Sequence, residues 1–148
     1  MSVPVEIDFA QVLMGDGASP EVFTAICDLT SVTLNEGAET STRRRRDCAK
    51  PNKPAARYSK VMGTFWDVSG TGLSNAPQIA TLRAALGKHK NYKIIGYRDD
   101  GTDAGDEVGT WSGQGVMTGR NYSIDREGDT SMEINIEGEG DLLFTPAS

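Results

Sequence analysis

The stretch SMEINIE, Ser131–Glu137, alternates apolar and polar residues more regularly than any other part of this chain. Met132, Ile134 and Ile136 point to one side of an extended backbone, and the acidic and amide side chains between them point to the other. A period of two is typical of a β-strand with one buried and one solvated face. The stretch therefore predicts a sheet protein whose core lies against one face of this strand.

Short apolar segments separated by turn residues recur along the rest of the chain. Gly15–Pro20 has the composition of a loop, and Asp99–Thr102 has that of a tight turn. Further strands are predicted at Val3–Phe9, Glu21–Cys27, Leu29–Leu34, Tyr92–Arg98, Glu107–Thr118 and Asn121–Asp125. With the hairpin described next, the count is about eight or nine strands, which indicates a mainly β fold of the sandwich or barrel kind.

A long protruding hairpin is predicted at about residues 40–62. Its limbs, Thr40–Arg46 and Arg57–Val68, can both be extended, and the prolines of Ala49–Pro54 break regular structure between them. The base of the second limb is expected in the core. With a period of two, one side of this limb carries Tyr58, Met62, Trp66 and Val68.

One α-helix is predicted at about residues 75–87. Asn75 is a favourable N-cap, and Gln78 is placed to complete a capping box. Gly87 is a natural C-terminal stop. The apolar stripe that would face the core consists of Ile79, Leu82 and Leu86.

Length and composition favour one small domain, residues 1–148. Hydrophobic residues make up 37% and glycines number 17, which suits a small β-rich core with many turns. The N-terminus lacks the basic and apolar regions of a signal peptide. The sequence has no run of about 18 apolar residues, so no transmembrane helix is predicted.

Nothing in the sequence predicts catalysis, a metal site or a cofactor. His89 stands between two lysines, without a visible orienting partner. The acids from Asp99 to Glu107 lack the spacing of a calcium-binding EF-hand, and Gly70-Thr71-Gly72 is not a phosphate-binding motif. Cys27 is expected as a small buried residue and Cys48 as a thiol on the hairpin. Free thiols are the default, although pairing of the two stays open.

Charge is distributed very unevenly. Arg43–Lys60 carries eight basic residues and one acid, a net +7, whereas the chain has a net charge of −6, so its remaining residues sum to −13. This basic arm could bind nucleic acid, form a solvated loop, or dock onto the acidic part of another subunit. The charge split favours docking, because complementary charges select and orient partners. Its basic residues are Arg43, Arg44, Arg45, Arg46, Lys50, Lys53, Arg57 and Lys60.

The order of these parts resembles the major tail tube proteins of long-tailed, siphovirus-type bacteriophages and gene transfer agents. The resemblance spans nearly the whole chain. Its most specific element is Trp66-Asp67-Val68-Ser69-Gly70-Thr71-Gly72, followed by one helix. The long hairpin, the Asp99–Thr102 turn and a closing segment from Ile136 to Leu142 complete the pattern.

This resemblance implies a structural subunit of the virion tail, assembled in the host cytoplasm, and not an enzyme. Hexameric rings would stack into a hollow tube that delivers DNA without binding it specifically, and the long hairpin would reach the adjacent ring. Further partners would be other tail proteins, such as the tape measure and the tail terminator, and no membrane. Tubes of this family have an acidic inner wall, for which Glu133, Glu137, Glu36 and Glu39 are the candidates.

A second interpretation is a monomeric β-sandwich module that binds nucleic acid or carbohydrate through the basic arm. Several cations clustered on one hairpin could contact several phosphates. Against this, Tyr58 is the arm's one aromatic residue, which gives single-stranded bases little to stack on. Measuring DNA binding as a function of salt separates this interpretation from self-assembly.

Overall fold

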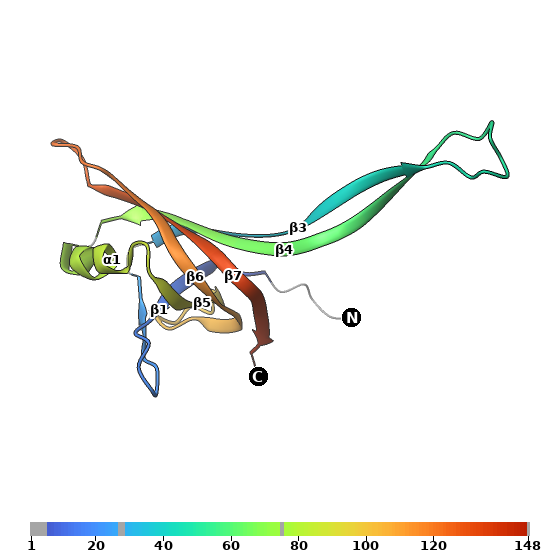
Figure 1. Ribbon diagram of the computed structural model, residues 1–148. Coiled ribbons are helices and arrows are strands. Elements are labelled where there is room, and N and C mark those ends of the chain that lie inside the picture. The colour runs from blue at the N-terminus through green and yellow to red at the C-terminus, as the bar shows by residue number, and fades with distance from the viewer. Residues whose placement is uncertain (1–5, 27–28, 75, 148) are drawn as a thin grey trace.

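The structure, a computed structural model, describes residues 6–26, 29–74 and 76–147. Its strands form one seven-stranded antiparallel sheet in the order β2-β1-β5-β6-β7-β4-β3 (Figure 1). A 3₁₀ turn and a short helix lie between β4 and β5. The elements are β1 Phe9–Gly15, β2 Phe23–Ala25, β3 Leu29–Arg45, β4 Ala56–Leu73, η1 Ala76–Gln78, α1 Ile79–Ala85, β5 His89–Arg98, β6 Asp106–Ser123 and β7 Ser131–Pro146.

The predicted mainly β fold, with one helix and a protruding hairpin, is confirmed. β3 and β4 continue far beyond the rest of the sheet as a two-stranded ribbon (Figure 1). β1, near one end of the strand order, also contacts β3 at the other end, so the sheet curls around its apolar face. The fold is therefore a sheet curled like a partly open barrel, from which one long hairpin projects.

The core gathers along one face of this sheet, as the alternation in β7 predicts. Met132, Ile134 and Ile136 are 3%, 0% and 1% exposed. α1 packs on the same face through Leu82 and Ala85. The other members of the buried cluster are Val12, Met14, Ile26, Trp66, Val68, Tyr92, Ile94 and Met117.

Several strand boundaries differ from the predictions. Residues 6–8 are not in a strand, and β1 begins only at Phe9, which lies opposite Tyr97 of β5. Val3 to Val5 and Cys27 lie outside the described residues. β2 is limited to Phe23–Ala25. Two other predicted breaks are absent. The predicted strand Leu29–Leu34 and the limb Thr40–Arg46, up to Arg45, belong to one strand, and β6 runs unbroken to Ser123, so the described sheet has seven strands.

The helix is confirmed, but the details of its ends are not as predicted. Asn75 lies outside the described residues. The predicted capping box between Asn75 and Gln78 therefore also falls outside the described residues. The Gln78 side-chain Nε2 donates to the carbonyl oxygen of Ala25, at 2.8 Å. Leu86 is 44% exposed, and Ala85 takes its place in the core. Gly87 has a φ of +77°, the left-handed conformation that ends a helix, as predicted.

Candidate functional site: the basic arm and the acidic sheet face

The basic arm is the outer part of the β3–β4 hairpin. Glu36 lies opposite the buried Trp66, and the strand pairing continues from there to Arg45 opposite Ala56. These ten residues of β3 span about 30 Å at the rise of an extended strand. The tip, residues 46–55, has no strand structure. All eight basic side chains are exposed, and within the described part of the chain none of them forms an ion pair.

A β-bulge marks the point where the arm leaves the body. Glu39 lies opposite Gly63 and Thr40 lies opposite Val61, so Met62 is an extra residue on β4. An extra residue reverses the alternation of the strand that carries it. The predicted common face of Tyr58, Met62 and Trp66 is therefore wrong. Trp66 is 3% exposed and belongs to the core, whereas Tyr58 is 56% exposed on the arm.

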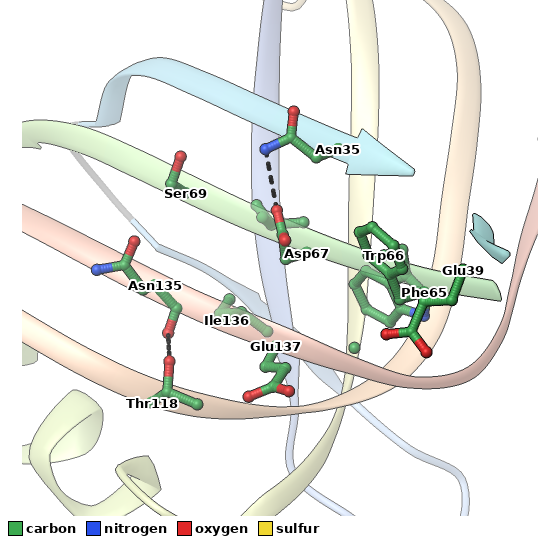
Figure 2. Close-up of a pocket in the computed structure, with 12 residues that line it drawn as sticks. Asn35, Glu39, Phe65, Trp66, Asp67, Ser69, Thr118, Asn135, Ile136 and Glu137 are labelled. Atoms are coloured by element: carbon green, nitrogen blue, oxygen red, sulfur yellow. Dashed lines mark hydrogen bonds between the residues drawn. The ribbon is translucent and has the colours of Figure 1, made fainter. Parts of the chain in front are cut away.

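A polar and acidic face lies on the side of β3, β4, β7 and β6 that points away from the core (Figure 2). Asp67 pairs in register with Glu137 of β7 and with Asn35 of β3, and Asn35 Nδ2 donates to Asp67 Oδ1 at 3.0 Å. Glu137 and Glu39 line one open groove of about 520 Å³ together with Asp67. The face is thus solvated and carries carboxylates from three neighbouring strands.

The four predicted wall carboxylates do not all share this face. Glu133 and Glu137 are exposed and alternate with the buried residues of β7, so they lie on it. Glu39 lines its groove. Glu36 lies opposite Trp66 in the strand pairing, which places it on the reverse side of the sheet, with the core residues. We therefore define the acidic face by Glu39, Asp67, Glu133 and Glu137.

Asp67 is the member that sequence reasoning missed. The alternation of Trp66, Asp67, Val68 and Ser69 already implied that Asp67 points away from the core. What the alternation could not show is that β4 lies next to β7, with Asp67 directly opposite Glu137. That pairing joins strands about 70 residues apart in the chain, and it depends on how the sheet assembles.

Trp66 joins the base of the arm to the core. Its indole ring occupies the space that a Cβ at Gly138 would fill, and it closely approaches Gly113 as well. Glycine at these two positions of β7 and β6 lets the large ring lie flat against the backbone. The predicted core role of Trp66 is confirmed. Trp111 is only half-buried and packs against Phe144, with ring centroids 4.9 Å apart.

The other polar features are local. His89 Nδ1 lies 2.7 Å from Glu139 Oε1, and both side chains are exposed. In the Asp99–Gly105 turn, hydrogen bonds from the side chain and backbone of Thr102 lower the pKa of Asp100. Among the described residues no group of three or more histidine, cysteine or acidic side chains could hold a metal ion. No helix in the described part of the chain is long and apolar enough to cross a membrane.

The fold can be compared with known proteins. No protein-family model matches the sequence, and no curated protein matches it. Among solved structures, the chain is similar to a chain of the SPP1 tail tube, with a TM-score of 0.63 and 16% identity over 97% of this chain and 80% of that one. It is also similar to a chain in the tail of an empty gene transfer agent particle with C6 symmetry, with a TM-score of 0.58 and 19% identity over 90% and 95%.

A third similar chain belongs to the tube-terminating cap of the anti-feeding prophage, with a TM-score of 0.66 and 13% identity over 99% of this chain and 94% of that one. At these identities the likeness concerns the fold. Over nearly its whole length, this chain has the fold that is found in tail tubes and related tube-like particles.

Proposed function

We propose that this chain is the structural subunit of a tail tube, in which rings of six copies stack into a hollow conduit for DNA. The observation that carries the proposal is the shared fold with the SPP1 tail tube chain, over 97% of this chain. The C6 symmetry of the gene transfer agent tail supports six copies in a ring. In this role the chain is an element of the virion tail, placed among tape measure and terminator proteins, and it needs no catalytic group.

The exposed strand edges of the sheet favour self-association. β3, with 17 residues, lies at one edge of the sheet, and within the described residues its outer edge is not hydrogen-bonded to a second strand. Proteins usually protect such an edge with prolines, charged side chains, short strands or a covering element, because unpaired N–H and C=O groups invite pairing with another chain. β3 is long and contains no proline, and its charged side chains lie from Glu36 outward, so its first half, residues 29–35, is an edge without these devices. A neighbouring copy in a ring would satisfy these groups.

In this proposal the acidic face forms the wall of the conduit. Glu39, Asp67, Glu133 and Glu137 lie on a side of the sheet that the helix and the core leave uncovered. Carboxylates repel phosphates, whereas basic groups bind them and release counterions. A wall of this composition lets DNA slide. Glu36 lies on the reverse side of the sheet and is left out of the wall.

The basic arm projects from the body and contacts the adjacent ring in this proposal. The arm carries a net charge of +7, whereas the net charge of the other residues sums to −13. The ribbon extends about 30 Å from Glu36 to Arg45, so one copy can present its cations to the acids of another. Because exposed charges are screened within about 8 Å at physiological salt, stacking should weaken as salt is raised.

The experiment is negative-stain electron microscopy of the purified protein, combined with sedimentation velocity, across protein concentration and salt. We expect rings or tubes with six-fold symmetry at neutral pH and moderate salt. A protein that stays monomeric at high concentration under every salt condition would contradict the proposal.

The exposed cations of the arm keep a second function open, a monomeric module that binds nucleic acid. The relevant assay measures binding of a DNA duplex against salt, for the wild type and for a variant with Ser at Arg43, Arg44, Arg45 and Arg46. Tight binding by a monomer, lost in the variant, would favour this second function. Self-assembly with weak DNA binding would favour the tail tube.

A further inference from the structure

We propose that the arm docks onto a second copy of this chain through only one of its two faces, the face that carries Arg43, Arg45, Tyr58 and Lys60. We call it the Tyr58 face, and we call the opposite side of the ribbon the Arg44 face. The partner surface is an acidic region of the second copy. This inference rests on the proposed function and names the surface by which the arm would act in it.

The Tyr58 face combines an aromatic ring with three cations. Arg43 lies directly opposite Tyr58, and Arg45 and Lys60 flank this pair on the same side of the ribbon. Together these side chains line a shallow hollow of about 340 Å³. The Tyr58 side chain is 56% exposed, so most of its ring is accessible to a partner. Tyrosine and arginine are enriched at the centres of protein–protein interfaces, where an aromatic anchor is surrounded by polar groups.

The Arg44 face has a different composition. Arg44 lies directly opposite Arg57, so two guanidinium groups share one cross-strand position. Like charges in this position repel each other. The neighbouring pair on this face is Thr42 and Ser59, which are small and offer no aromatic surface. This face carries charge but no aromatic ring, which makes it the weaker candidate for a specific contact.

The bulge at Met62 creates this division. On the body side of the bulge, β3 and β4 pair in the register that places Glu39 opposite Gly63. Without the extra residue, the same register would continue into the arm and place Arg45 opposite Arg57, and Tyr58 opposite Arg44. The extra residue shifts the pairing by one, which gathers Tyr58 and Lys60 on the side of Arg43 and Arg45. Bulges that re-aim side chains are recurrent features at functional positions in sheets.

The partner follows from the charges. Within the described residues, none of the arm's cations forms an ion pair with an acid of its own chain. The rest of the chain sums to −13, so a second copy supplies the complementary surface. Complementary charges orient two surfaces and reject incorrect pairings, and an exposed aromatic ring adds contact area that salt does not screen.

The test compares two matched double variants in the full-length protein. Arg43→Glu with Lys60→Glu reverses two charges on the Tyr58 face, and Arg44→Glu with Arg57→Glu reverses two charges on the Arg44 face. Both change the net charge by the same amount on the same exposed hairpin. We expect the first to raise the protein concentration needed for half-maximal assembly at least about tenfold, and the second to change it less than about threefold.

A second pair of variants separates the ring from the charges. Tyr58→Ala should weaken assembly, whereas Tyr58→Phe should assemble as the wild type does. Circular dichroism and thermal unfolding of every variant serve as controls for the fold. Equal impairment by the two charge reversals, or stronger impairment by the Arg44 pair, would overturn the inference while a tube-forming wild type upholds the proposed function. A wild type that forms no tubes would instead refute the proposed function.

Discussion

Replacing Trp66 by alanine tests whether the arm is anchored to the core as the structure shows. Trp66 is 3% exposed, and its ring packs against the backbone at Gly138 and Gly113. Its Nε1 has no hydrogen-bond partner within the described part of the chain, so the variant loses packing and no hydrogen bond. Gly138 and Gly113 have no side chains that could fill the space left by the ring. The full free-energy cost of the cavity is therefore expected.

The expected loss is about 4 kcal/mol in the free energy of unfolding, within the range for large-to-small changes of buried aromatic residues. For a chain of this length each kcal/mol lowers the Tm by about 2–4 °C, so the Tm should fall by about 8–16 °C. Urea unfolding followed by circular dichroism measures the free energy directly. An unchanged m-value would show that the compactness of the end states is preserved.

Phe65→Ala is the matched control. Phe65 precedes Trp66 on the same strand and points to the other face, where its ring lies over Gly37 and is 46% exposed. Its removal should cost less than about 1.5 kcal/mol, because water already reaches much of the ring. Equal losses for the two variants, or a loss below about 1 kcal/mol for Trp66→Ala, would refute the assignment of Trp66 to the core.

Three further predictions concern single groups. Burial raises the pKa of Tyr92 to about 12, so the native state loses stability as pH rises from the unfolded value of 10 through 12. Tyr92→Phe should abolish this loss, measured by urea unfolding at several pH values. Because the hydroxyl is buried without a partner in the described part of the chain, the variant's stability at pH 7 should be unchanged or higher by about 1 kcal/mol. Hydrogen bonds from backbone amides of its own loop lower the pKa of Asp16. The ionised carboxylate therefore stabilises the fold above the unfolded pKa, and this stabilisation is lost as pH falls. The Tm difference between wild type and Asp16→Ala should shrink below about pH 4. Glu133→Lys with Glu137→Lys should leave the Tm nearly unchanged, because both side chains are exposed, yet make assembled tubes bind short DNA in a salt-dependent manner; absent DNA retention at low salt would argue against these residues lining the lumen.

Sequence patterns predicted the fold where local periodicity and core packing agree. From Ser131 to Glu137 every second residue of β7 is buried, and the alternation alone was enough to assign the two faces of this part of the strand. The predictions were weaker at boundaries. β1 begins at Phe9, where its pairing with β5 begins, and the Gln78 side chain bonds to the carbonyl oxygen of Ala25, far away in the chain. Those outcomes depend on residues distant in the chain, which periodicity does not report.

The candidate site shows the same division. The composition of the arm and the acidity of the remaining chain are local properties, and both were evident before the structure. The face on which each charge lies was only partly evident. Glu36 joins the core side through its pairing with Trp66, and Asp67 joins Glu137 through the adjacency of β4 and β7.

Local patterns in the chain were therefore enough to predict a sheet protein with one helix, a buried face on β7 and a basic hairpin on an acidic body. They did not show which strands are neighbours, how far β3 and β4 extend together, or where one extra residue, Met62, shifts their register; these features follow from the folded arrangement. The physical reason is that alternation depends on the geometry of a single extended backbone, whereas register depends on hydrogen bonds and packing between strands. A shift of one residue moves side chains such as Tyr58 to the other face without any change in the local pattern.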